Sequence, residues 1–146
     1  MHLKMFGMEL DVTGLARMRV GEHAIHTWDV VVALDPAATV APDAVALLID
    51  TLDQLAARSG KPDGKQRKVR VSTTGPERQF ILETGEAVTL TPSDDETTHE
   101  PGLSELRLPA EAFSRLVYGR MDEAHTPPAE SAGVELGELR PIFPGF

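Results

Sequence analysis

Cysteine is absent from this 146-residue chain. Its absence excludes a disulfide framework, a thiolate zinc site and a cysteine nucleophile. A chain without cysteine suits a reducing or an oxidising compartment equally, so the absence localises nothing by itself.

Aromatic residues and positive charge are both in short supply. One tryptophan, one tyrosine and five phenylalanines leave most of the interior to aliphatic side chains and alanine. The formal net charge is −9 and the isoelectric point is near 4.9. This charge argues against nucleic acid or an anionic membrane surface as a partner, because both call for a basic patch.

Long apolar runs and targeting signals are missing as well. No run reaches the roughly 18–20 apolar residues that span a bilayer. Residues 1–8 lack the continuous apolar region and the small-residue cleavage site of a secretory signal. We therefore expect a soluble, cytoplasmic protein. The length suits one domain, or one domain plus an appended element, and the 41% of hydrophobic residues suffice for a core.

Two helices are predicted after an extended lead-in of about eleven residues. The first runs from about Thr13 to Leu34 and ends before Pro36, since a residue that precedes proline avoids the α region. It is apolar on two faces, whereas a surface helix of a small domain buries only one. The second runs from about Pro42 to Ala57, and its core stripe consists of Val45, Leu48, Leu52 and Leu55.

The apolar period changes from 3.6 to 2 after the second helix, which predicts strands. Three of them, with turns between, form an antiparallel meander, and a fourth follows; they cover residues 69–72, 80–82, 88–90 and 103–108. A last helix is predicted from Pro109 to about Arg120, and residues 134–139 form a short strand or a helical turn. The expected fold class is α+β: two N-terminal helices, then a small antiparallel sheet of three to five strands packed with a C-terminal helix. The apolar C-terminal end is expected to pack against this body.

Glu22 and His26 have the most informative spacing in the sequence. They are four residues apart in the first helix, so they lie one above the other on one face, and Asp29 follows three residues later. The same face carries the apolar residues Leu15, Met18, Ile25 and Ala33. Burying a polar group there without a partner costs roughly 2–7 kcal/mol, and a charge costs more. A divalent metal bound by Glu22 and His26, with Asp29 as an outer partner, would satisfy them, and so would a buried Glu22–His26 hydrogen bond capped by water.

A third metal ligand is not evident. A catalytic zinc site takes three protein ligands and keeps a fourth position open. His23 points about 100° away from Glu22 on the helix and is expected in solvent. His99 and His125 lie in polar loops and are expected at the surface, and no spacing supports His2 as a ligand.

Arg120 is the other candidate residue. It follows Tyr118 and Gly119 and continues the apolar stripe of the last predicted helix. A cation there could stabilise the C-terminal end of the helix through the helix dipole, by about 0.3–1 kcal/mol. It could instead bind a substrate carboxylate through two hydrogen bonds. Arg19 lies three residues before Glu22 and is expected to pair with it.

Three segments together resemble the mycothiol-dependent maleylpyruvate isomerase family. They are Arg19-x-x-Glu22-x-x-x-His26-Thr27-Trp28-Asp29-Val30, Tyr118-Gly119-Arg120 and the terminal Phe143-Pro144-Gly145-Phe146. The resemblance implies an N-terminal four-helix bundle of the DinB type and a smaller C-terminal α/β domain somewhat like sterol carrier proteins. It also implies a divalent metal, usually zinc, held by a histidine of an earlier bundle helix together with Glu22 and His26. The metal would activate the thiol of mycothiol, and Arg120 would assist catalysis.

The resemblance covers the chain as the C-terminal portion of such a protein. Residues 1–36 correspond to a lead-in and the last helix of an incomplete metal-binding bundle, and residues 37–146 to the C-terminal domain. The preceding bundle helices and their histidine have no counterpart in the sequence. We therefore expect a metal- and thiol-dependent enzyme, incomplete as a lone chain, that acts on a small-molecule substrate. A homodimer through the exposed Leu15, Met18 and Ile25 stripe would be one way to rebuild the site.

Two other interpretations stay open. The chain could be a non-catalytic module that binds a small ligand or another protein, with Glu22 and His26 joined by a structural hydrogen bond. It could also be a small, complete domain of unrelated function. No interpretation calls for nucleic acid or a membrane as partner.

Overall fold

The computed structural model describes residues 3–5, 8–94 and 100–145, and within them the fold class is α+β, as predicted. The lead-in forms two short antiparallel strands, β1 (Leu3–Met5) and β2 (Met8–Leu10). Within the described residues, no helix combines the length and the apolar character needed to cross a membrane.

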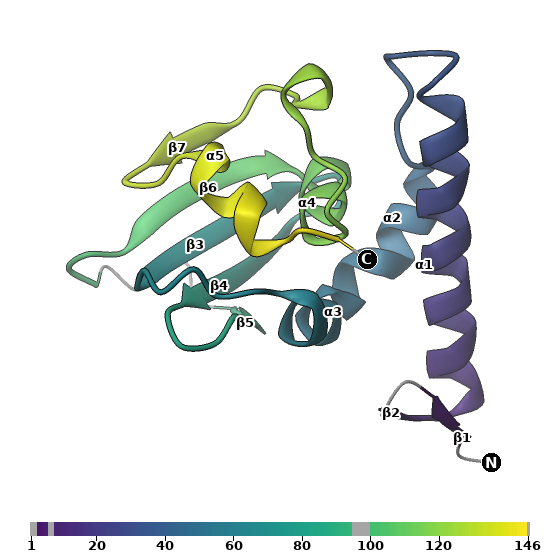
Figure 1. Ribbon diagram of the computed structural model, residues 1–146, viewed down its shortest axis with the longest axis horizontal. Coiled ribbons are helices and arrows are strands. Elements are labelled where there is room, and N and C mark those ends of the chain that lie inside the picture. Colours follow the sequence, from purple (N-terminus) through teal and green to yellow (C-terminus); the bar gives the residue numbers. More distant parts are fainter. Residues whose placement is uncertain (1–2, 6–7, 95–99, 146) are drawn as a thin grey trace.

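The first predicted helix is α1 (Val12–Val31), which stands along one side of the molecule (Figure 1). Asp11 caps it, because its carboxylate accepts a hydrogen bond from the Gly14 backbone N–H at 2.7 Å. The helix ends three residues earlier than expected. The indole N–H of Trp28 donates to the Ala38 carbonyl at 2.9 Å, which holds the following loop against the helix.

The second predicted helix is divided into α2 (Pro42–Leu48), the 3₁₀ turn η1 (Ile49–Thr51) and α3 (Leu52–Ser59). At the division the Thr51 hydroxyl donates to the Leu48 carbonyl at 2.8 Å, a local bond that competes with the regular helix ladder. The predicted core stripe is confirmed nevertheless, since Val45, Leu48, Leu52 and Leu55 are all buried.

The predicted meander is confirmed as β3 (Arg67–Thr74), β4 (Arg78–Thr84) and β5 (Thr89–Pro92), all antiparallel neighbours. The fourth strand, β6 (Ser104–Pro109), pairs with β3 in parallel, so the sheet is mixed and not purely antiparallel. A short strand, β7 (Glu130–Ala132), completes the order β5-β4-β3-β6-β7. Parallel pairing needs a long connection, and here residues 75–103, which include β4 and β5, separate β3 from β6 in the sequence.

One face of the sheet makes the core. It packs against α3, against α4 (Ala110–Val117) and against the C-terminal turns α5 (Leu136–Leu139) and η3 (Arg140–Ile142). The main contributors from the sheet are Val69, Val71, Phe80, Leu82, Leu106 and Leu108. Ile142 and Phe143 are buried too, so the expected packing of the C-terminal end is confirmed. Between β6 and β7 the chain also forms a 3₁₀ turn, η2 (Glu123–His125).

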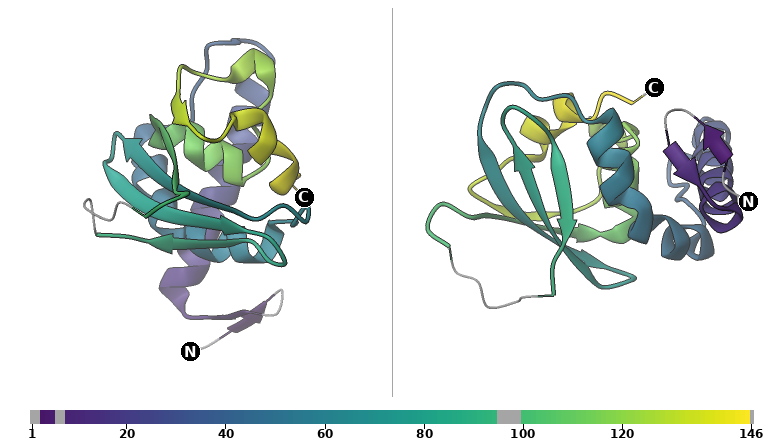
Figure 2. Two further views of the ribbon diagram at one scale, coloured as in Figure 1. Left: turned by 90° about the vertical axis from the view of Figure 1, so that its left-hand side faces the viewer. Right: turned by 90° about the horizontal axis from the view of Figure 1, so that it is seen from below.

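Helices α2, α3 and α4 lie between α1 and the sheet (Figure 2). Helix α1 faces them through Gly21, Ile25 and Trp28, all buried. Ile25 is buried in this contact and Leu15 and Met18 are half-buried, so the stripe expected to drive a dimer is largely covered. The exposed large apolar side chains of α1 and of the turn after it are others: Val12, Val20, Val30, Val31 and Leu34.

Candidate functional site

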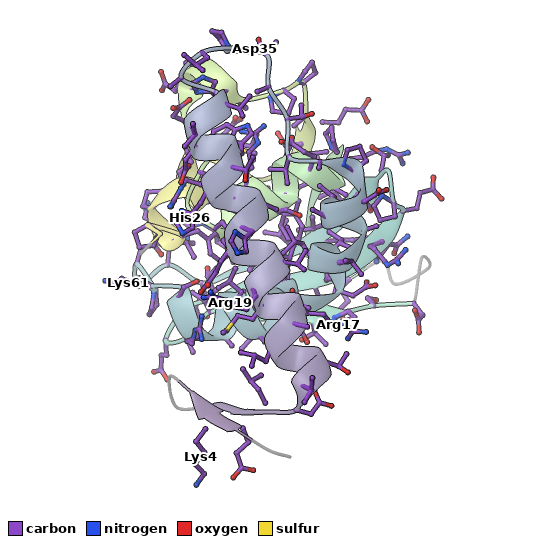
Figure 3. All side chains as sticks on the ribbon, turned by 90° about the vertical axis from the view of Figure 1, so that its right-hand side faces the viewer. Lys4, Arg17, Arg19, His26, Asp35 and Lys61 are labelled. Atoms are coloured by element: carbon purple, nitrogen blue, oxygen red, sulfur yellow. The ribbon has the colours of Figure 1, made fainter. Side chains whose placement is uncertain are left out.

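The Glu22–His26 pair lies at the rim of the contact between α1 and the rest of the molecule. The Glu22 side chain is 33% exposed and that of His26 is 66% exposed. The expectation that both occupy a buried apolar stripe is therefore wrong for His26. Figure 3 shows His26 on the side of α1 turned away from the sheet. The reason is that the helix packs through Gly21, Ile25 and Trp28, which lie about 100–160° around the axis from His26.

Each of the two residues has its own charged partner. Glu22 pairs with Arg19, whose Nη1 lies 3.4 Å from Oε2, as the spacing predicts. His26 Nδ1 lies 3.4 Å from Oδ2 of Asp29. In the described part of the chain no hydrogen bond joins Glu22 to His26.

Asp29 connects α1 to the C-terminal part of the chain. While Oδ2 faces His26, Oδ1 accepts a hydrogen bond from Arg120 Nε at 2.9 Å. Arg120 is thereby anchored, and its Nη1 also donates to the Tyr118 carbonyl at 3.1 Å. The three side chains form one line, His26–Asp29–Arg120, that spans two separate elements of the fold.

Arg120 reaches Asp29 because α4 ends earlier than predicted. The helix stops at Val117, and Gly119 has a φ of +72°, a backbone conformation that other residues rarely adopt. A Cβ at Gly119 would also lie 2.3 Å from the backbone nitrogen of Gly145. The turn therefore directs Arg120 toward α1, and it does not extend the apolar stripe of α4. It also brings residues 118–120 against Asp29 of α1 and against Gly145 near the C-terminal end.

The remaining histidines do not complete a ligand set. His2 and His99 lie outside the described residues, and His23 is exposed as expected. His125 is half-buried, against the expectation of a surface residue, because its ring packs edge-on against Trp28 with centroids 5.8 Å apart. Within residues 3–5, 8–94 and 100–145, no three His, Asp or Glu side chains are arranged to hold a metal ion. Glu22 and His26 offer one oxygen and one nitrogen donor, which fit a metal as part of a set.

A cavity beside Glu22 was not foreseen from the sequence. It has a volume of about 120 Å³ and lies between the N-terminal half of α1 and the η1–α3 segment. Tyr118 lines it and is only 7% exposed. Burial raises the pKa of Tyr118 to about 12; the negative charge of Glu22 adds to the rise and the positive charge of Arg58 opposes it. The sequence signal that could have indicated this packing is Gly21 in mid-helix, where a Cβ would lie 2.5 Å from the Tyr118 hydroxyl.

Arg115 is a second residue that the sequence did not single out. It is 4% exposed, and its guanidinium pairs with Glu111 through contacts of 2.7 and 3.1 Å. It also donates to the His125 carbonyl at 2.8 Å and stacks over the Trp28 ring, 4.9 Å from the centroid. Glu111 in turn accepts a hydrogen bond from the Val40 backbone. This group locks α1 to α4, and the i, i+4 spacing of Glu111 and Arg115 was its only sequence signal.

Comparison with models of known protein families gives no match, and comparison with curated protein sequences gives none either.

Proposed function

We propose that Glu22 and His26 are part of a divalent metal site, with zinc as the metal, in a thiol-dependent enzyme similar to the mycothiol-dependent maleylpyruvate isomerases. In this proposal the chain corresponds to the C-terminal portion of such an enzyme. The observation that supports it most is the His26–Asp29–Arg120 line. Histidines that bind metals typically give their other ring nitrogen to a carboxylate, which fixes the ring and the tautomer.

In the proposal, the His26–Asp29–Arg120 line leaves the Nε2 atom of His26 to bind the metal. Because Nδ1 of His26 faces Asp29, Nε2 is the donor, and the Glu22 carboxylate lies one helical turn away. Asp29 is itself oriented by Arg120, so the ring is held from a second element of the fold. The exposure of His26 is consistent with this role, since a ligand must face the space that the metal occupies.

A bound metal would lower the pKa of a coordinated thiol, such as that of mycothiol, toward neutral pH. The protein side chains would position the reactants. Arg120 holds Asp29 through Nε and the Tyr118 carbonyl through Nη1, so within the described residues Nη2 is the nitrogen left for a substrate carboxylate. In this proposal Arg120 mainly positions Asp29, and it also contacts the substrate.

Two donors are fewer than the three that a catalytic zinc site takes. We propose that the others come from outside the described residues, on a chain or segment packed against the outer face of α1. The exposed apolar residues of α1 and of the turn after it, which include Val20, Val30 and Leu34, could contact such a partner. A second copy of the chain is one candidate for this partner.

Zinc titration by calorimetry, with the mass in solution measured alongside, tests the proposal. We expect saturable zinc binding that is lost in Glu22→Ala and in His26→Ala. The matched control is His23→Ala, which removes an exposed histidine from the same helix and should leave binding unchanged. Equal zinc binding by all four proteins, or none by the wild type, would refute the metal site.

The alternative is a module that binds a small ligand without catalysis. It draws on a different observation, the cavity between α1 and α3. In that case Glu22→Ala and His26→Ala would lose no zinc affinity, and the cavity alone would account for the function.

A further inference from the structure

The cavity between α1 and the η1–α3 segment has the size of a small-molecule site. At about 120 Å³ it is far larger than the space that one water needs, which is about 10–15 Å³. Gly14 of α1 lines it without a side chain. The surrounding groups are polar on one part and apolar on another.

Charged side chains of both signs line the cavity. Arg17 lines it from α1 and Arg58 from α3. Two acids line it as well, but both already have cationic partners. Asp50 accepts hydrogen bonds of 2.8 and 3.2 Å from Arg78, and Glu22 pairs with Arg19.

Arg17 differs from most cations of the described chain. Its guanidinium makes no hydrogen bond within the described residues, although it lies close enough to lower the pKa of Asp50 as a minor cause after Arg78. The guanidinium of Arg17 therefore lines the cavity without a hydrogen-bond partner among the described residues. A guanidinium can bind a carboxylate through two parallel hydrogen bonds. Positive groups are also scarce in this protein, whose net charge is −9.

Tyr118 supplies a neutral donor at the same site. With a pKa of about 12 the phenol keeps its proton at any physiological pH, so it can donate but cannot act as a base. The apolar part of the lining consists of Leu10, Met18 and Leu55.

We propose that this cavity binds a small organic acid with one carboxylate and a short apolar chain. The carboxylate lies between Arg17 and Arg58 and accepts a hydrogen bond from Tyr118, and the chain lies against Met18 and Leu55. Binding at this site needs neither a metal on Glu22 nor a thiol. The proposal is therefore independent of the proposed enzymatic function.

Calorimetric titration of the full chain with butanoate, in the presence of a chelator, tests the site. We expect saturable binding that weakens roughly tenfold or more in Arg17→Met and in Arg58→Met, since each loses a charged hydrogen-bond donor. Tyr118→Phe should weaken it by a smaller factor. Arg107→Met, which alters an exposed arginine on the sheet, should leave the affinity unchanged.

Two further probes separate the contributions of charge and shape. Butanamide has the same shape without the charge and is expected not to bind. Inorganic phosphate has the charge without the apolar chain and should bind at least tenfold more weakly than butanoate. Absence of butanoate binding, equal binding by Arg17→Met, or equal binding of either probe would overturn the proposal. The chelator removes zinc from every titration. These results therefore do not depend on whether Glu22 and His26 bind zinc.

Discussion

Gly21 is a point of close approach between α1 and the rest of the molecule, and Gly21→Ala tests that packing. A Cβ at this position would lie 2.5 Å from the Tyr118 hydroxyl and 2.6 Å from Cδ2 of Leu48. Both neighbours are buried and held from other sides. Overpacking of this kind costs about 1–3 kcal/mol, and two contacts so short favour the upper end. Alanine returns about 1 kcal/mol through its higher helix propensity. We therefore expect a net loss of about 2 kcal/mol in the free energy of unfolding.

Urea unfolding monitored by tryptophan fluorescence measures this loss, because the only tryptophan, Trp28, is buried on the same helix face. The matched control is Gly14→Ala, one heptad earlier on α1. Its Cβ would meet the exposed Asp11 carboxylate and the Leu10 side chain at 3.2 Å, contacts that small shifts relieve. We expect Gly14→Ala to leave the stability unchanged or to raise it by up to about 1 kcal/mol.

Tyr118→Phe removes the shorter of the two contacts and completes the test. In a double-mutant cycle, Gly21→Ala and Tyr118→Phe should show a coupling energy of about 1 kcal/mol, since the phenol oxygen is no longer in the way. If Gly21→Ala is as stable as the wild type, or if it is additive with Tyr118→Phe, α1 does not pack against Tyr118 as described.

Further predictions concern Tyr118 and two ion pairs near α1. Tyr118 is the only tyrosine, so the phenolate absorbance reports its pKa alone. It should titrate near pH 12 in the folded protein and near pH 10 in concentrated urea. Glu22→Gln should lower the pKa of Tyr118 in the folded protein. Because the folded pKa is the higher one, stability should fall as the pH rises from about 10 toward 12, as unfolding at a series of alkaline pH values will show. Arg115→Met leaves a largely buried carboxylate without its partner and should cost about 3 kcal/mol or more in urea unfolding; a loss below about 1 kcal/mol would contradict the locking role. Asp29→Asn weakens the contact with Arg120 and should lower the zinc affinity by roughly 10–100-fold. The free energy of unfolding should fall by only about 1 kcal/mol. Unchanged zinc affinity would show that Asp29 does not support the site.

Much of the fold could be predicted because its elements depend on local periodicity. The stripe from Val45 to Leu55 and the alternation of the meander both reflect burial on one face, which the sequence records directly. The break at Thr51 could not be predicted, since a threonine hydroxyl bonds the preceding carbonyls in many unbroken helices too. The parallel pairing of β6 was also hidden, because a strand's partner depends on the path of the chain between the strands.

The candidate site was predictable as a set of residues but not as a geometry. The spacing placed Glu22, His26 and Asp29 on one side of α1 correctly. It could not decide which side of a helix with two apolar faces is covered, and the close approach at Gly21 decides this. The role of Arg120 depends on the turn at Gly119, which ends α4 and turns the side chain toward Asp29.

The most direct test of the metal site is to locate the metal. Crystals of the zinc-loaded protein, with diffraction data collected at the zinc absorption edge, would show the ion as an anomalous peak. We expect the peak about 2.0–2.2 Å from Nε2 of His26 and from a carboxylate oxygen of Glu22, with Asp29 still on Nδ1 of the same ring. Zinc bound elsewhere, with His26 and Glu22 making no contact to it, would contradict the account.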